Sequence, residues 1–171
     1  MSQLHIRVVT PTDTNEVLKA GNFVQEHSWG LNYPLKARDF LAKADFLVLG
    51  HLIVDTVEVL TSIAAVTTYQ GNPADPEDTC PYLCCLVTHP EDRKFGYGTQ
   101  VYRAALRTAR KRGFHTIHAT TDSEVTTQFL VTRPRWYLWE NPWTVRAPGL
   151  NEDRSPHVRL RCFLGLPPLI G

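Results

Sequence analysis

The 171-residue chain is 43% hydrophobic and carries 18 Lys plus Arg against 17 Asp plus Glu. That composition suits one globular domain with a single core and predicts no extended basic surface for nucleic acid, so we expect one domain over residues 1–171 with a loose C-terminal end at 165–171. No apolar run approaches the length of a membrane span and the first residues lack a signal-peptide pattern, so we expect a soluble, cytoplasmic protein with no membrane contact.

Five segments in the first 70 residues carry signals of secondary structure. Alternating apolar and polar residues predict a half-buried strand, and two apolar stripes after it predict helices, the first ending near residues 28–30. Val, Ile, Leu and Thr are concentrated in the next two segments, which we expect to be antiparallel strands joined by a turn near Asp55. The predicted elements are a strand at 4–9, a helix after the turn at 10–13, a helix at 35–44, and strands at 46–54 and 57–69.

The middle of the chain predicts a strand, a loop, a long helix and a second strand. The continuous apolar run at 82–87 is typical of a central strand covered on both faces. From Tyr97 the apolar residues follow a helical period, and Gly113 is suited to end that helix. A right-handed crossover would make the strands at 82–87 and 115–121 parallel. The remaining predicted elements are a short helix at 123–131 and strands at 136–145 and 158–164.

The four cysteines, Cys80, Cys84, Cys85 and Cys162, do not form a metal-binding pattern. They contain no C-x-x-C pair and no paired histidine spacing accompanies them, so we predict no metal site. Cys84 and Cys85 are consecutive residues of the apolar strand, and we expect their side chains on opposite faces of the sheet. All four are expected to be reduced and to act as small hydrophobic residues.

A short glycine-containing loop separates the apolar strand from the long helix and reads Arg93-x-x-Gly96-x-Gly98. Glycines let the backbone approach a ligand closely, and a helix N-terminus directs N–H groups toward it, so this loop predicts an anion site. The dinucleotide fingerprint fails because Val101 occupies the position of its third glycine. A Walker A loop is also excluded, since no Gly-Lys-Ser/Thr sequence occurs.

The run at 90–98 reads Pro-Glu-Asp-Arg-Lys-Phe-Gly-Tyr-Gly. It resembles motif A of the GCN5-related N-acetyltransferase (GNAT) family, in which Pro-x-x-Arg-x-x-Gly-x-Gly binds the pyrophosphate of acetyl-CoA. The order of the predicted elements is also similar to that family from end to end. The resemblance implies an α+β, three-layer fold with a mixed, mostly antiparallel sheet of about six or seven strands, a parallel splayed pair formed by strands four and five, and about four helices.

The resemblance further implies an N-acetyltransferase that takes acetyl-CoA as cosubstrate and needs no metal. Main-chain groups of Leu86 and Val87 would bond the pantetheine arm between the splayed strands, and Ser123 could bond it from the short helix. An N-cap is an alternative role for Ser123, and ordinary surface charge is the alternative for Arg93 and Lys94. The implied pyrophosphate site comprises Arg93, Lys94, Phe95, Gly96, Tyr97, Gly98 and Thr99.

Acyl transfer also needs a general acid and a general base. Many family members carry a tyrosine on the short helix that protonates the leaving thiolate, but Leu130 occupies that position here. His118, with a reference pKa of about 6.5, is a candidate general base, although a histidine in a strand can also be structural. Tyr137 is the nearest tyrosine downstream of Leu130, and main-chain N–H groups near Val87 would polarise the thioester carbonyl.

The acceptor in this family is an amine, which here could belong to a small molecule or to a protein. If the family layout holds, the end of the first helix and the loop after it face the acceptor. The acceptor-side candidates are Glu26, His27, Trp29 and Tyr33, with core packing as the alternative for the aromatic residues. The sequence leaves the acceptor's identity and a homodimeric state open.

Two other functions compete with the enzyme. Leu130 in place of the acid motivates a catalytically silent CoA-binding or protein-interaction domain on the same fold. Arg103, Arg107 and Arg110 on the long helix motivate a nucleic-acid-acting protein, although a solvated helix face explains them and the near-zero net charge opposes that function.

Overall fold

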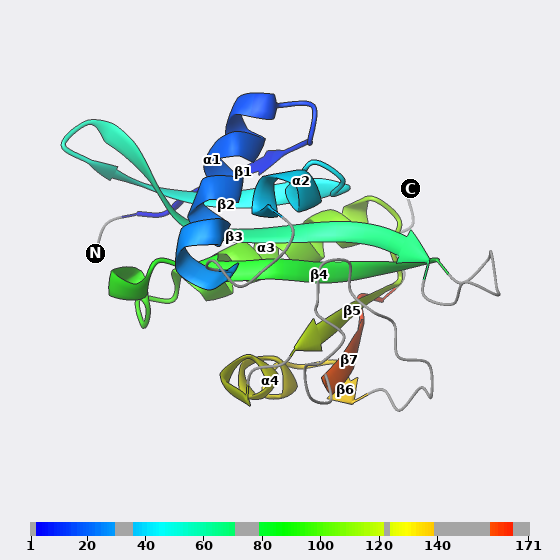
Figure 1. Ribbon diagram of the computed structural model, residues 1–171. Helices are drawn as coiled ribbons and strands as arrows, with labels where there is room; N and C mark the ends of the chain where they lie inside the picture. The colour runs from blue at the N-terminus through cyan, green and yellow to red at the C-terminus, as the bar shows by residue number, and fades with distance from the viewer. Residues whose placement is uncertain (1–2, 30–35, 71–78, 122–123, 139–157, 166–171) are drawn as a thin grey trace, which may run out of the picture.

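The computed structural model describes residues 3–29, 36–70, 79–121, 124–138 and 158–165. Seven strands form one sheet in the order β1-β2-β3-β4-β5-β7-β6 (Figure 1). The strands are β1 (His5–Val9), β2 (Phe46–Val54), β3 (Val57–Gln70), β4 (Thr79–Thr88), β5 (Thr116–Thr121), β6 (Trp136–Leu138) and β7 (Val158–Phe163). The helices are α1 (Thr14–Val24) with a π-helical turn η1 (Gln25–Trp29), α2 (Ala37–Leu41), a 3-10 turn η3 (Pro90–Asp92), α3 (Tyr97–Lys111) and α4 (Glu124–Val131).

The expected mixed sheet with one parallel pair is confirmed. β4 and β5 run parallel, while each of the other neighbouring pairs is antiparallel. In the described residues β4 and β5 are paired at a single position, Tyr82 with His118. Beyond it β4 continues to Thr88 beside β3, whereas β5 diverges toward β7 (Figure 1). The sheet is therefore splayed between its fourth and fifth strands, and His118 lies where the splay begins.

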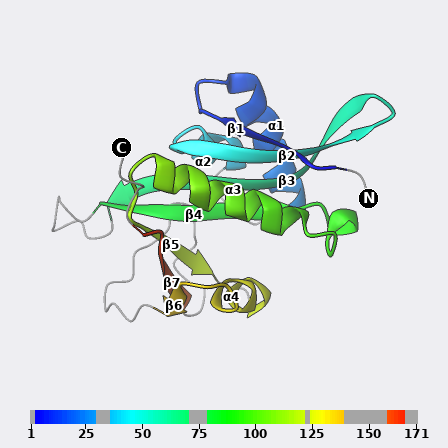
Figure 2. The same cartoon turned by 180° about the vertical axis from the view of Figure 1, so that it is seen from behind.

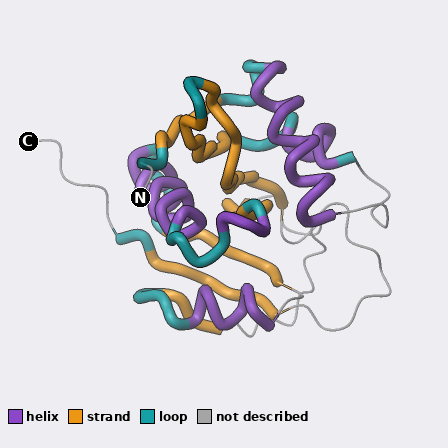
Figure 3. Tube along the Cα trace, turned by 90° about the vertical axis from the view of Figure 1, so that its left-hand side faces the viewer, coloured by secondary structure: helices purple, strands orange, loops and turns teal. Residues whose placement is uncertain are grey.

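Helices cover both faces of the sheet, which gives the three layers that the sequence predicts (Figure 3). α1 and α2 pack together on one face, and α3 crosses β2, β3 and β4 on the other (Figure 2). α4 contacts β5, β6 and β7 and shares the core of the α3 face. The two helices on that face, α3 and α4, stand on either side of the splay.

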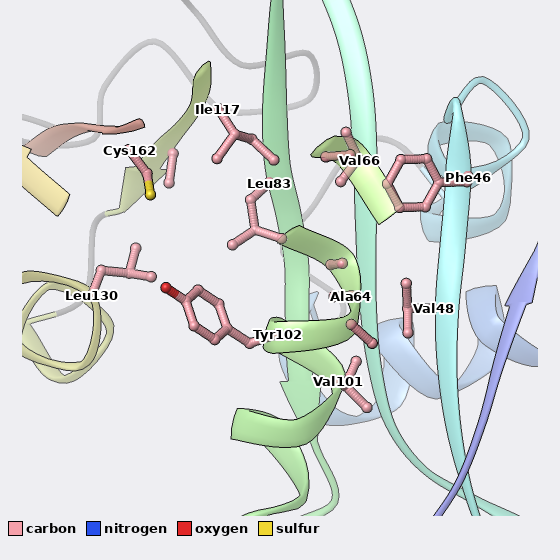
Figure 4. Packing of buried hydrophobic residues seen from close by; sticks show 14 of the residues in the cluster. Phe46, Val48, Ala64, Val66, Leu83, Val101, Tyr102, Ile117, Leu130 and Cys162 are labelled. Atoms are coloured by element: carbon pink, nitrogen blue, oxygen red, sulfur yellow. The ribbon is translucent and has the colours of Figure 1, made fainter. Parts of the chain in front are cut away.

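The larger core lies between the sheet and the pair α3 and α4 (Figure 4). α3 is amphipathic, and its buried stripe includes the small residues Ala104, Ala105 and Ala109, which let the helix approach the strands closely. Gly50 serves the same contact, because a Cβ there would lie 2.8 Å from Cγ2 of Val101. The second core, beneath α1 and α2, is built from side chains such as Val17, Phe23, Leu41, Leu47 and Ile63.

β4 contains a bulge that overturns the expectation for the two adjacent cysteines. β3 pairs Ile63 with Val87 but Ala65 with Cys84, so β4 holds one residue more than β3 over this stretch. Cys85 adopts a positive φ of 52°, and both Cys84 and Cys85 pack against the core beneath α1 and α2. The prediction of opposite faces was wrong because strand alternation does not hold across a bulge.

The predicted element boundaries agree closely with the structure in most places. The strand predicted at 136–145 is seen as β6 over its first three residues, and its remainder lies outside the described residues. The predicted loose end at 165–171 lies outside them as well, apart from residue 165. Within the described residues, no helix has the length and hydropathy needed to cross a membrane.

Candidate functional site

A pocket of about 360 Å³ lies where β4 ends and α3 begins. The segment from the end of β4 to the first turn of α3 forms most of its wall, and the C-terminal part of α4 with the residue after its end supplies the rest. The pocket thus joins elements from both sides of the splay. Its lining residues are Thr88, Asp92, Arg93, Lys94, Gly96, Tyr97, Gly98, Thr99, Phe129 and Arg133.

The loop before α3 has two residues with positive φ and leaves the N-terminus of the helix without a side-chain cap. Lys94 and Gly96 have φ values of 79° and 81°, in the left-handed region that favours glycine. Gly96 is the N-cap of α3, makes no side-chain capping bond, and is followed by a first turn without acidic residues. The positive end of a 15-residue helix is therefore left without a side-chain acceptor, as an anion site requires.

Gly98 fits the helix against the end of β4. A Cβ at this position would lie 2.7 Å from Oγ1 of Thr88. The hydroxyls of Thr88 and Ser62 are 2.9 Å apart, and Ser62 donates to the carbonyl oxygen of Val87 at 3.1 Å. Gly96 differs, since a Cβ there would meet nothing within 4 Å. Gly98 is thus required for close packing, whereas Gly96 is required for its backbone conformation.

The charged side chains around the pocket are mostly positive. Arg93 is anchored by a bond of 3.3 Å from its Nε to the carbonyl oxygen of Thr88, and Lys94 is exposed. Asp92 is the one carboxylate in the lining, and its Oδ2 lies 3.8 Å from Nδ1 of His89. Six of the seven predicted loop residues line the pocket, and Phe95 is the exception. Its ring is half exposed, with its centroid 5.9 Å from that of the buried Tyr97.

Arg133 completes the pocket, and sequence reasoning missed it. Its guanidinium carbon lies 4.1 Å from the centroid of the Phe129 ring, and Nη2 donates to Oγ1 of Thr99 at 3.4 Å. Its Nε is buried and has no hydrogen-bond partner within the part of the chain that the structure describes. Arg133 follows a helix whose sequence does not match the family pattern at Leu130, so no motif marked it; only the fold brings it to α3.

The predicted base is buried at the start of the splay and does not line the pocket. The His118 side chain is 3% exposed and its ring centroid lies 5.4 Å from that of Tyr82. It lies on the strand next to the one that carries Leu86 and Val87. The Leu86 side chain packs on the α3 face and the Val87 side chain on the α1 face. A ligand beside this part of β4 would therefore meet main-chain groups rather than these side chains.

Of the acceptor-side candidates, the structure describes the side chains of Glu26 and His27. Glu26 is largely exposed, whereas the His27 ring stacks edge-on between Phe23 and His89, with centroid distances of 4.7 and 4.6 Å. His89 directly follows β4, so η1 lies beside the start of the phosphate loop, a contact that the sequence did not reveal. Tyr33, Ser123 and the side chains of Trp29 and Tyr137 lie outside the described residues.

Leu130 is a core residue, 2% exposed. Figure 4 shows the Tyr102 hydroxyl directed toward it from α3. Nε1 of Trp136 donates to that hydroxyl at 2.7 Å, and burial raises the pKa of Tyr102 above its ordinary value. The position expected to carry an acid therefore belongs to a packed seam between α3, α4 and β6.

Across the part of the chain that the structure describes, no three His, Cys, Asp or Glu side chains are grouped to hold a metal ion. The pocket lining carries one carboxylate, that of Asp92, beside the three cations Arg93, Lys94 and Arg133, and this is not a metal-binding set. Its chemistry fits a phosphate-bearing molecule such as coenzyme A, because it offers several donors and excess positive charge.

Solved structures with the same fold include several acyltransferases. The chain is similar to an acyl-CoA N-acyltransferase from Pseudomonas aeruginosa, with 14% identity, a TM-score of 0.63, and coverage of 94% of this chain and 99% of that one. It is similar to a mosquito arylalkylamine N-acetyltransferase like 5b, at 10% identity, a TM-score of 0.65, and coverage of 94% and 100%.

A third similar structure is N-acetylglutamate synthase from Neisseria gonorrhoeae, complexed with coenzyme A and N-acetyl-glutamate. Identity is 16% and the TM-score 0.60, over 96% of this chain but 36% of that longer chain. At these identities the likeness shows the fold alone. No curated protein sequence matches the chain.

The family is shown by a sequence model rather than by these structures. The model of the acetyltransferase (GNAT) family matches residues 24–129, more than half of the chain. The match spans the elements from the end of α1 to α4, including the bulged strand β4 and the whole phosphate loop. This protein belongs to the acetyltransferase (GNAT) family.

Proposed function

We propose that this protein is a coenzyme A-dependent N-acetyltransferase that transfers an acetyl group from acetyl-CoA to an amine. The observation that carries the proposal is the pocket at the N-terminus of α3. Uncapped helix N–H groups and the cations Arg93, Lys94 and Arg133 meet there beside the splay between β4 and β5. Such a combination binds a diphosphate with little further side-chain chemistry.

The loop and the splayed strands have separate tasks in this proposal. The pyrophosphate would bind to residues 93–99 of the loop and first helical turn. The pantetheine arm would then run along β4 and bond to the main chain of Leu86 and Val87, with Ser123 as a further partner. A reactive thioester reaching the splay would lie near the bulge of β4.

Acyl transfer also needs an acid and a base. An amine must attack in its neutral form, so a base has to accept its proton, since a lysine-like amine has a pKa of about 10.4. His118 is our candidate for the base, acting through water because its ring is buried. The Val87 N–H would donate to the carbonyl oxygen as negative charge develops on it, and Tyr137 is our candidate to protonate the leaving thiolate.

The acceptor would approach from the side of α1. Glu26, His27, Trp29 and Tyr33 belong to η1 and the segment after it, and η1 contacts the end of β4 through the rings of His27 and His89. A carboxylate and aromatic rings suit an amine, which is cationic until it loses its proton. We propose a small-molecule or protein amine as the acceptor, and the cytoplasm, where acetyl-CoA is available, as the location.

A second function deserves a test because Leu130 is buried where an acid is expected. With that position filled by a core residue, the protein could bind CoA or a protein partner without catalysing transfer. The two functions differ in turnover and share the CoA site.

Acetyl-CoA turnover separates the two functions. Purified protein is mixed with acetyl-CoA and a panel of small amines and peptides, and the release of free CoA thiol is followed. The enzyme predicts thiol release that depends on one class of amine. Tight acetyl-CoA binding without thiol release over a wide panel would instead favour the silent domain.

A further inference from the structure

Among the described residues, the partners of the Arg133 cation are all neutral. Its guanidinium makes two long hydrogen bonds to hydroxyls: Nη2 donates to Oγ1 of Thr99 at 3.4 Å, and Nη1 donates to Oγ1 of Thr132 at 3.5 Å. The ion pairs of the described residues do not include it, and its buried Nε donates to nothing. A buried N–H without an acceptor is costly, and a guanidinium normally satisfies such donors with an anion.

The neighbours of Arg133 decide which of its guanidinium N–H groups can reach a ligand. The ring of Phe129 covers one face of the guanidinium at 4.1 Å, so the donors at its edge remain for a ligand. Nη2 is already within 3.4 Å of Thr99, a residue of the first turn of α3. The edge of the guanidinium and the uncapped N–H groups of that turn therefore line the same pocket.

We propose that Arg133 binds the diphosphate of coenzyme A from the end of α4, beside the first turn of α3. The inference rests on the proposed function and adds a binding residue from outside the glycine loop. The contact with Thr99 favours the diphosphate over the 3′-phosphate, because Thr99 belongs to the first turn of α3, where a helix offers its free N–H groups.

The consequence is a link across the splay. Arg133 follows α4, whereas the glycine loop precedes α3, and these two helices flank the gap between β4 and β5. A diphosphate held by both would tie the two halves of the sheet together at the mouth of the gap. The bound nucleotide would thereby fix α4 beside the pantetheine arm.

The test compares the affinities of Arg133→Gln, Arg133→Lys and wild-type protein for coenzyme A and for dephospho-CoA, measured by calorimetry. Arg107→Gln is the matched control, because Arg107 is an exposed arginine of α3 outside the pocket. We expect Arg133→Gln to weaken both ligands by equal factors of about 10- to 100-fold, the loss of one charged hydrogen-bonding partner. Arg133→Lys should recover part of the loss, and Arg107→Gln should bind as wild type does.

Three results would overturn the inference. Unchanged affinity in Arg133→Gln would show that the residue does not touch the ligand. A loss for coenzyme A with dephospho-CoA spared would assign Arg133 to the 3′-phosphate instead. In both cases the proposed function would still hold, because the wild-type protein binds the coenzyme. The third result is a wild-type protein that binds neither ligand, which would contradict the proposed function together with this inference.

Discussion

His51 of β2 is a buried histidine in a charged neighbourhood. It lies beneath α1 with 5% of its surface exposed, its Nε2 is 4.0 Å from Oε2 of Glu16, and Nη1 of Arg7 is 3.9 Å from the same oxygen. Burial, reinforced by the charge of Arg7, holds the pKa of His51 below its ordinary value. The folded protein therefore favours the neutral imidazole.

This shift makes stability depend on pH in a defined direction. Because the pKa of His51 is lower in the folded state, the unfolded chain binds the proton first as pH falls. The stabilisation is complete above the unfolded pKa of about 6.5 and is lost as pH falls toward the folded pKa. Urea denaturation at pH 5 to 8 should show the free energy of unfolding falling below neutrality, with a smaller fall in His51→Gln.

His5→Gln is the control for this experiment. His5 is exposed and pairs with His51 across the ladder of β1 and β2, so the two substitutions remove the same group from neighbouring positions. His5→Gln should keep the part of the pH dependence that His51 causes, because His51 stays buried in that variant. If the free energy of unfolding depended on pH equally in wild type and His51→Gln, His51 would be protonated as easily in the folded protein as in the unfolded chain.

The bulge at Cys85 is a feature of a single residue that the sequence did not predict. A run of apolar residues at 82–87 predicts a strand correctly, but it carries no sign of which residue is extra. The bulge at Cys85 arises from the pairing of β4 with β3, which is a tertiary contact. A hydrogen bond with Cys84 and burial raise the pKa of the Cys85 thiol well above its ordinary value, so the thiol is a poor nucleophile at neutral pH.

At the scale of elements, the junction of β4 with α3 decides the shape of the pocket. Thr88, Ser62 and the Val87 carbonyl form a hydrogen-bonded row, and Gly98 lies against its end. The helix can begin so near the strand only because Gly98 has no Cβ. The first helical turn and the strand end are therefore held in one arrangement before any ligand binds.

Gly98→Ala should disturb this junction. The new Cβ would lie 2.7 Å from Oγ1 of Thr88, so the hydroxyl would have to leave Ser62 or the helix would have to move. We expect a loss of about 1–3 kcal/mol in the free energy of unfolding, measured with urea, and weaker binding of acetyl-CoA. In a Thr88→Ala background the loss should be smaller, because the opposing hydroxyl is gone.

Gly96→Ala provides the comparison within the same loop. A Cβ at Gly96 would meet open space, but its φ of 81° disfavours other residues, at a cost of roughly 1–2 kcal/mol. That loss should not depend on Thr88. If Gly98→Ala were equally destabilising with and without Thr88→Ala, close packing would not be the reason for the glycine.

The sequence was most informative where one element carries its own signal. Helical periodicity predicted α3 and the glycines predicted the phosphate loop, each within a few residues. Alternation predicted the position of β1, but the strand is not half-buried as expected, because Ile6 and Val8 are exposed and Val9 is its one buried residue. The spatial order, in which β7 lies between β5 and β6, depends on long-range pairing and was not anticipated. Arg133 was missed for the same reason, since its contacts with Thr99 and Phe129 appear only after α3 and α4 have packed.

At the scale of the whole molecule, the splay divides the sheet into two parts that serve one site. The larger part, from β1 to β4, carries α1, α2 and α3 together with the glycine loop. The smaller part, from β5 to β6, carries α4 and leads to Arg133. The pocket is lined from both parts, so a ligand bound there would contact the two halves of the fold at once.

A crystal structure of the protein with coenzyme A would test the assignment of the pocket most directly. We expect the diphosphate within hydrogen-bond distance of the main-chain N–H groups of residues 96–99, with the pantetheine arm leading into the gap between β4 and β5. We also expect the guanidinium of Arg133 to contact the diphosphate. A coenzyme bound elsewhere, or a diphosphate that does not touch the first turn of α3, would contradict the central claim.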